Sequence, residues 1–185
     1  KTRRPKKRIT AKDIPNIYPV GSEVMVQVTK GPIGSKGPRV TTNLSFAGRY
    51  LVFMPYSERS GISRKIEDPK ERERLRKILG QLEIPDGIGV IIRTVGEGQR
   101  ARYFVRDLSY LVEQWVRVEA LIKDEPAPCR VFEKPVLADR PLRDFLTDGI
   151  GECVCNDWSA PDRICERLGE FSGAARERVT FCRGA

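Results

Sequence analysis

The sequence lacks the features that mark membrane, secreted and zinc-binding proteins. No apolar run approaches the roughly 20 residues that a membrane-spanning helix needs, and the N-terminus lacks the apolar segment of a signal peptide. Histidine is absent, and the five cysteines include no Cys-x-x-Cys pair. We therefore expect a cytoplasmic protein with reduced thiols, without a membrane span and without a bound metal.

Two sets of residues in the C-terminal part resemble metal or catalytic ligands. Cys153 and Cys155 alternate in "GECVCND", which places both on one face of a strand, and buried packing explains them better than zinc does. Several acidic residues also fall in this part, and helix caps and surface positions explain them better than metal catalysis does. These acids are Asp139, Asp144, Asp148, Glu152 and Asp157.

The charge balance is strongly basic. The 185 residues are 39% hydrophobic and 32% charged, which is typical of a globular protein with a core. Lysine and arginine number 34 against 25 acidic residues, a net charge of +9, so we expect an anionic partner. Nucleic acid is the commonest such partner, and anionic lipid is the competing interpretation. Six positive charges in the first eight residues predict either an arm attracted to phosphate or a solubilising tail.

The spacing of apolar residues predicts two strands near the start of the chain and two helices after them. Residues 22–30 and 38–55 have the pattern of two long antiparallel strands, joined by a glycine-containing loop that does not match a phosphate-binding P-loop. A helix is expected after Asp68 as N-cap, with a charged face that we expect to be solvated. A second helix spans much of 107–125 and ends before Pro126, with Trp115 in the core.

Strands and helices alternate in the last third of the chain. We expect a short strand around Val131, a helix over 140–148, a strand over 152–157, a helix opened by Ser159 and a strand over 178–182. This alternation favours an α/β unit with part of a mixed sheet.

One strand ends in an unusual way. Residues 89–92 are mainly β-branched and read as a buried strand, which then presents Arg93 and Thr94 side by side. A guanidinium and a hydroxyl together suit a tetrahedral anion such as phosphate, although a surface salt bridge explains the pair as well. At the end of a strand, we expect Arg93 to project into solvent.

Four stretches in order give the chain a close resemblance to the ribonuclease E/G family of bacterial endoribonucleases: "SKGPRVTTNLSFAGRYLVFMP", "GISRKIED", "LEIPDGIGVIIRTVGEG" and "RDLSYLVEQW". The resemblance runs from about Val20 to the C-terminus. It implies an α+β chain with the C-terminal strands of an OB-type RNA-binding barrel (19–46), a 5′-sensor region (47–138) and part of a ribonuclease-H-like subdomain (139–185). These parts follow the basic arm or loop (1–18) that the charges predict.

The resemblance also assigns residues. It implies that Arg93 and Thr94 grip a 5′-terminal monophosphate, with Arg64 as a second sensor residue. Gly48 and Val52 match positions whose backbone meets the 5′ nucleotide. Lys36 matches a lysine that contacts RNA on the barrel.

The family's catalytic machinery is expected outside this chain. In the family, the metal-binding aspartates, with their magnesium, and a zinc-binding cysteine pair that links protomers lie downstream, and we expect its first barrel strands to precede Lys1. We therefore expect no catalytic residue, metal or cofactor here, no RNA cleavage by this piece alone, an incomplete or rearranged barrel, and a homo-oligomeric longer protein. The expected function is binding of single-stranded RNA and sensing of its 5′-monophosphate in RNA processing and decay. The alternatives are a stand-alone RNA-binding or ribosome-associated module without nuclease activity and a scaffold for acidic proteins.

Overall fold

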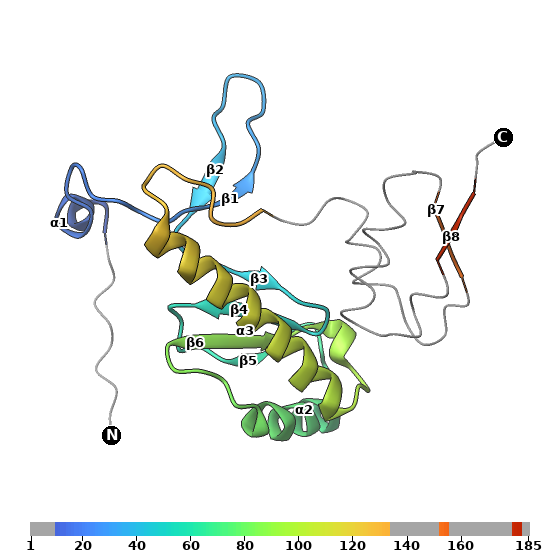
Figure 1. The fold of residues 1–185 in the computed structure, drawn as a ribbon. Coiled ribbons are helices and arrows are strands. Elements are labelled where there is room, and N and C mark those ends of the chain that lie inside the picture. The colour runs from blue at the N-terminus through green and yellow to red at the C-terminus, as the bar shows by residue number, and fades with distance from the viewer. Residues whose placement is uncertain (1–9, 134–151, 156–178, 183–185) are drawn as a thin grey trace, which may run out of the picture. The chain divides into compact units, whose positions relative to one another are not determined.

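The computed structural model describes residues 10–133, 152–155 and 179–182 (Figure 1). The chain divides into two compact units, Lys1–Leu44 and Ser45–Ala185, which are taken separately below. The basic residues 1–8, the expected helices over 140–148 and after Ser159, and all of the acids named above except Glu152 lie outside the described residues.

The first unit contains a short β-hairpin. After a helical segment, η1 (Ala11–Asp13) and α1 (Ile14–Ile17), strand β1 (Gln27–Lys30) pairs antiparallel with β2 (Arg39–Thr41), and Val28 lies opposite Val40. The antiparallel pairing agrees with the prediction. The strands are shorter than expected, and the described residues form no closed barrel.

The prediction of one continuous strand over 38–55 is wrong. The segment forms three strands, which are β2, β3 (Phe46–Ala47) and β4 (Leu51–Pro55). A side-chain turn in which Asn43 N donates to Thr41 Oγ1 ends the first strand, and a tight turn at 48–50 separates the other two. Only β3 and β4 therefore join the sheet of the second unit.

The second unit is built on a four-stranded mixed sheet of order β3-β4-β6-β5. Strand β6 (Ile88–Ile92) pairs antiparallel with β4 and parallel with β5 (Gly61–Ile62). Val90 and Ile92 are fully buried, which confirms the predicted interior strand.

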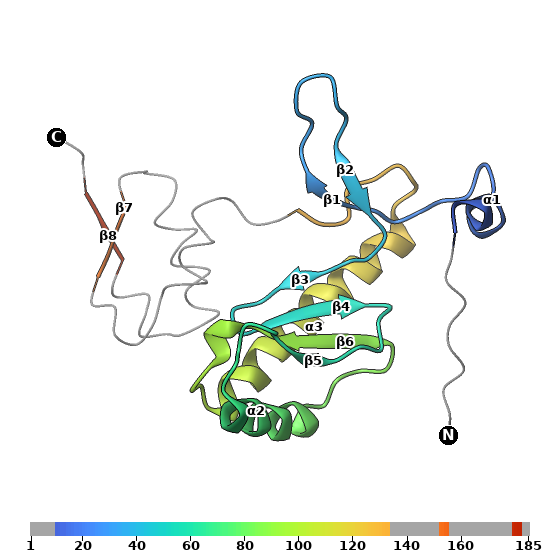
Figure 2. The same ribbon diagram turned by 180° about the vertical axis from the view of Figure 1, so that it is seen from behind.

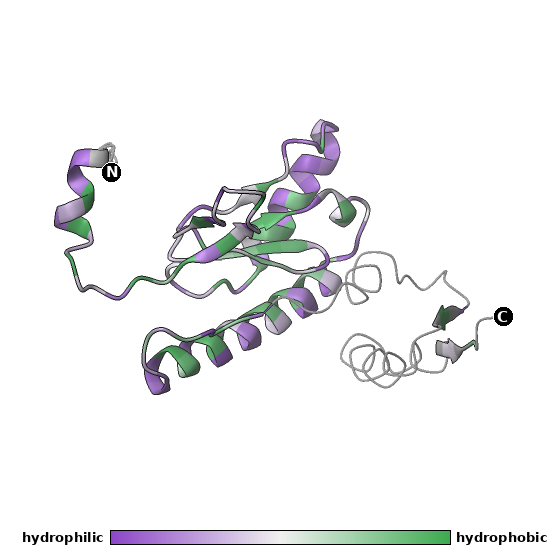
Figure 3. Cartoon of the chain, turned by 90° about the horizontal axis from the view of Figure 1, so that it is seen from above, coloured by the Kyte–Doolittle hydropathy of each residue, from purple (hydrophilic) through white to green (hydrophobic). Residues whose placement is uncertain are grey.

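Helix α3 (Ala101–Asp124) lies across one face of this sheet, and Figure 2 shows the strands in front of it from the other side. Apolar and polar residues alternate along α3 with the period of an amphipathic helix (Figure 3). The helix begins six residues earlier than predicted but ends before Pro126 as expected. Trp115 is buried and packs edge-on against Phe46, so its predicted core position is confirmed.

Helix α2 (Pro69–Gln81) begins as the sequence predicts. The Asp68 carboxylate accepts hydrogen bonds from the amides of Lys70 and Glu71, both at 3.2 Å, and Leu75 is fully buried. The expectation that its charged face is merely solvated is wrong in part. Arg72 Nη1 donates to the carbonyls of Ser63 (2.9 Å) and Ile66 (2.8 Å), so the helix is bonded to the segment after β5.

The C-terminal part contributes a parallel pair of strands, β7 (Cys153–Cys155) and β8 (Val179–Phe181). Both were predicted, whereas residues 131–133 form no strand, contrary to the expectation around Val131. The fold class is α+β, as predicted. None of the helices in the described ranges is long and apolar enough to cross a membrane.

Candidate functional site

Three segments that are distant in the sequence meet at one edge of the four-stranded sheet. Parallel strands β5 and β6 both end there, and antiparallel β4 begins there, so the topology brings their adjoining turns together. Two backbone hydrogen bonds join the segments: Ser63 N donates to Ile92 O and Arg93 N donates to Tyr50 O, each at 2.8 Å. The turn at 48–50, the segment 63–64 and the pair 93–94 therefore form one continuous edge.

Arg93 is half-buried rather than projecting freely into solvent. Its Nη1 donates to the carbonyl oxygens of Gly48 at 2.6 Å and Arg49 at 3.1 Å. The expectation that Arg93 projects into solvent is therefore wrong, because the β3–β4 turn presents carbonyl groups within reach of the guanidinium. These contacts fix the orientation of the planar fork at the sheet edge.

Asp107 is the residue that the sequence analysis missed. Its carboxylate, buried on α3, accepts hydrogen bonds from the amides of Arg49 (3.0 Å), Tyr50 (2.8 Å) and Leu51 (2.8 Å). Burial raises the pKa of Asp107, while the three amide donors and the positive charge of Arg93 oppose that rise. Its position in the sequence could have indicated its burial, because it lies three residues after Phe104 and four before Leu111, on the apolar face of the helix.

Gly48 is required by this carboxylate. A Cβ atom at position 48 would lie 2.5 Å from Asp107 Oδ2 and 2.6 Å from Oδ1. Its amide donates to Leu51 O at 2.9 Å, and its carbonyl accepts from Arg93. Val52 lies one residue inside β4, half-buried between β3 and β6. Backbone contact of either residue with a nucleotide stays a prediction.

Thr94 and Arg64 are exposed at the same edge. Thr94 opens the short 3₁₀ helix η2 (Thr94–Gly96) directly after Arg93, and Arg64 follows Ser63 beyond β5. Lys36 lies in the first unit, in the turn of its hairpin, where its backbone pairs with that of Ile33. The structure thus brings together Gly48, Arg64, Arg93 and Thr94, and leaves Lys36 on the separate unit.

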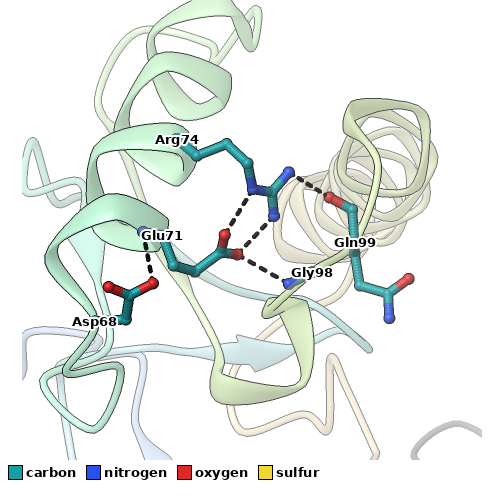
Figure 4. Close-up of polar contacts among 5 residues, drawn as sticks. All are labelled: Asp68, Glu71, Arg74, Gly98 and Gln99. Carbon is teal, nitrogen blue, oxygen red and sulfur yellow. Dashed lines mark hydrogen bonds and ion pairs between the residues drawn. The ribbon is translucent and has the colours of Figure 1, made fainter.

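A clasp between Glu71 and Arg74 holds the loop that follows η2 (Figure 4). Glu71 accepts from Arg74 Nε at 2.7 Å, from Arg74 Nη2 at 2.6 Å and from the Gly98 amide at 2.8 Å. Arg74 Nη1 reaches the carbonyl of Gln99 at 2.8 Å. The hydrogen bonds from Arg74 lower the pKa of Glu71, with a smaller contribution from Gly98. Helix α2 is thereby bonded to the far end of the loop that begins with Thr94.

The edge is suited to an anion rather than to a metal. Its exposed side chains, Arg64 and Thr94, are basic or hydroxyl-bearing. The guanidinium of Arg49 lies 5.1 Å from the centre of the Tyr50 ring, and its buried Nε has no hydrogen-bond partner among the described residues. Within the same residues, no three acidic or cysteine side chains are grouped as metal ligands. Guanidinium and hydroxyl donors of this kind suit a phosphate by charge and by hydrogen bonding.

Comparison with known proteins identifies the family of the chain. Residues 45–185 match the ribonuclease E/G family. The chain is 40% identical to ribonuclease E of Escherichia coli K12 over 147 residues and 40% identical to ribonuclease G of the same strain over 139 residues, which are 77% and 75% of this chain. A 38% identity to ribonuclease E of Buchnera aphidicola extends over 91% of the chain. The matched regions are 14%, 28% and 18% of those three relatives. The chain belongs to the ribonuclease E/G family.

Proposed function

We propose that this chain provides the RNA-binding and 5′-monophosphate-sensing part of a ribonuclease E/G-type endoribonuclease that acts in RNA processing and decay. The observation that carries the proposal is the convergence of Arg93, Thr94 and Arg64 at one edge of the sheet. These three side chains come from two strand ends, and a third segment, the turn at Gly48, orients the arginine fork.

The chemistry of these groups fits a terminal phosphate monoester. Such a phosphate carries a charge of about −1.5 to −2 near neutral pH and three acceptor oxygens. Two guanidinium groups and a hydroxyl offer donors in several directions, and hydrogen bonds to charged groups are among the strongest in proteins. A 5′-hydroxyl lacks the charge, and a 5′-triphosphate is bulkier than a site built for one phosphate, so both are disfavoured.

The remaining parts of the function extend beyond the edge. Single-stranded RNA is the proposed partner, with Lys36 on the β1–β2 hairpin as a further contact. Cleavage is proposed to be metal-dependent and to use magnesium bound outside the described residues, which offer no suitable ligand group. The longer protein is proposed to be homo-oligomeric and to act in the cytoplasm, where the RNA is processed.

Two matched RNAs test the sensing role. They share one sequence and differ only in a 5′-monophosphate or a 5′-hydroxyl, and their dissociation constants are measured for wild type, Arg64→Gln and Thr94→Val. Both side chains are exposed, so folding should be spared. Each substitution should weaken the preference for the monophosphate by about 1–3 kcal/mol, with little effect on the hydroxyl-ended RNA.

The control is Arg76→Gln, the same change at an exposed position of α2. It should leave the preference unchanged. Equal weakening of both RNAs by Arg64→Gln would make Arg64 a general backbone contact. A wild-type chain that binds both RNAs equally would refute the sensing function and leave a module that binds RNA without regard to its 5′ end.

A further inference from the structure

The turn between β3 and β4, residues 48–51, is held from two sides by oppositely charged side chains. Its amides at 49, 50 and 51 all donate to Asp107, and its carbonyls at 48 and 49 accept from Arg93. A short stretch of backbone thus lies between a buried carboxylate on α3 and the guanidinium at the end of β6. Both charged groups therefore make hydrogen bonds to the same turn.

We propose that Asp107 is a positioning residue for 5′-phosphate recognition, acting through the turn and Arg93 without touching the RNA. This inference rests on the proposed function. Two of the three amide bonds to Asp107 are buried, and buried backbone donors need a partner. Without the carboxylate, the turn would rotate to bring its amides to water, and the two carbonyls that hold Arg93 would move with it.

Displacement of those carbonyls would free the arginine. An arginine side chain has several rotatable bonds, and a phosphate that binds it must first restrict them. In the observed arrangement, Arg93 Nη1 already makes two hydrogen bonds to fixed backbone, so part of this ordering precedes binding. Electrostatic attraction between the Asp107 carboxylate and the Arg93 guanidinium also favours this placement.

The Asp107 carboxylate also determines which hydrogen-bond donors remain available to a phosphate. Successive amides that point the same way form a concave anion-binding site in many proteins. Here Asp107 already occupies the amides of residues 49–51, and Gly48 leaves the space that its oxygens need. An incoming phosphate is therefore bound by side chains at the edge, whose orientation depends on the occupied amides.

Asp107→Asn tests the inference in the full chain. The side chain has the same size, but its NH₂ group replaces one of the two oxygens that accept from the turn, so at least one of the three amides loses its acceptor and faces another donor, and the turn should shift. The measured quantity is the ratio of dissociation constants for the 5′-hydroxyl and 5′-monophosphate RNAs. Because both constants come from one preparation, their ratio does not depend on the folded fraction. We expect it to fall at least about tenfold, with displaced NMR amide signals for Arg49, Tyr50 and Leu51.

Val118→Ala is the matched control. Val118 is buried on the same helix, and its truncation should destabilise the fold without reaching the turn. Its ratio should equal that of wild type. Asp107→Ser is the second variant, since serine retains one acceptor without adding an NH₂ group, and it should lower the ratio as well.

The outcomes separate the two proposals. A wild-type ratio near one refutes the proposed function itself. A wild-type preference that survives in a folded Asp107 variant, with the turn amides displaced, overturns the positioning role and leaves the sensing function standing.

Discussion

Replacement of Glu71 by glutamine should destabilise the fold far more than the same change two positions along the helix. Glu71 accepts three hydrogen bonds, two from Arg74 and one from the Gly98 amide, and its side chain retains only 14% of its exposure. Glu73 lies in the same helix, but its ion pair with Lys77 is 3.3 Å long and both side chains are more than half exposed. The pair of variants therefore compares a clasp between segments with a surface ion pair.

The magnitude follows from these contacts. A hydrogen bond to a charged group contributes about 1.5–3 kcal/mol, whereas an exposed ion pair between helix residues four apart contributes about 0.3–0.5 kcal/mol. Glutamine has the size of glutamate and can still accept one hydrogen bond. The total cost in stability should therefore be smaller than the sum over all three bonds. We expect Glu71→Gln to cost about 1.5–3 kcal/mol and Glu73→Gln less than about 0.5 kcal/mol.

Urea unfolding at several pH values measures the effect. The hydrogen bonds lower the pKa of Glu71 below its ordinary value of 4.5, so its contribution is fully present above that pH and is lost as the pH falls through the lowered pKa. The difference between wild type and Glu71→Gln should therefore be constant near pH 7 and shrink below about pH 4.5. Equal costs for the two variants at neutral pH would show that the clasp adds nothing beyond an exposed ion pair.

Three further changes probe other parts of the chain. Arg93→Gln should cost about 1.5–3 kcal/mol of stability, because it removes the hydrogen bonds to the carbonyls of Gly48 and Arg49. The same change at the exposed Arg64 should alter stability by no more than about 0.5 kcal/mol. Equal stabilities of the two variants in urea would contradict a stabilising role for the hydrogen bonds of Arg93. Gly96→Ala should lower the free energy of unfolding by about 1–3 kcal/mol, measured by heat or urea, because the new Cβ would lie 2.8 Å from the buried Phe104 ring. Gly80→Ala in α2 is the control: its Cβ meets nothing within 4 Å, and it should stabilise the helix by about 0.5–1 kcal/mol. Deletion of residues 1–8 should flatten the salt dependence of RNA binding by about 0.7 in slope for each phosphate that the arm neutralises, and an unchanged slope would show that the arm does not bind RNA.

The local elements of the second unit follow from short stretches of sequence. Asp68 and Pro69 set the start of α2, because capping depends on residues within one turn of the helix. The apolar period of α3 predicted the burial of Trp115, and the β-branched run before Arg93 predicted an interior strand. Each of these signals is contained in a few neighbouring residues. The family resemblance added the expected grouping of Arg64, Arg93 and Thr94.

The way in which the site is held together depends on tertiary structure. The segment 38–55 satisfied the pattern of one strand, yet a turn at Gly48 interrupts it because Asp107 binds the amides of Arg49, Tyr50 and Leu51. Those partners lie 56–58 residues apart, and Arg93 lies 45 residues from the carbonyl of Gly48. Hydrogen bonds between residues this far apart in the chain produce no periodic pattern in the sequence. They form only when the packing of α3 and β6 brings their polar groups to the same edge, where burial requires that each donor find an acceptor.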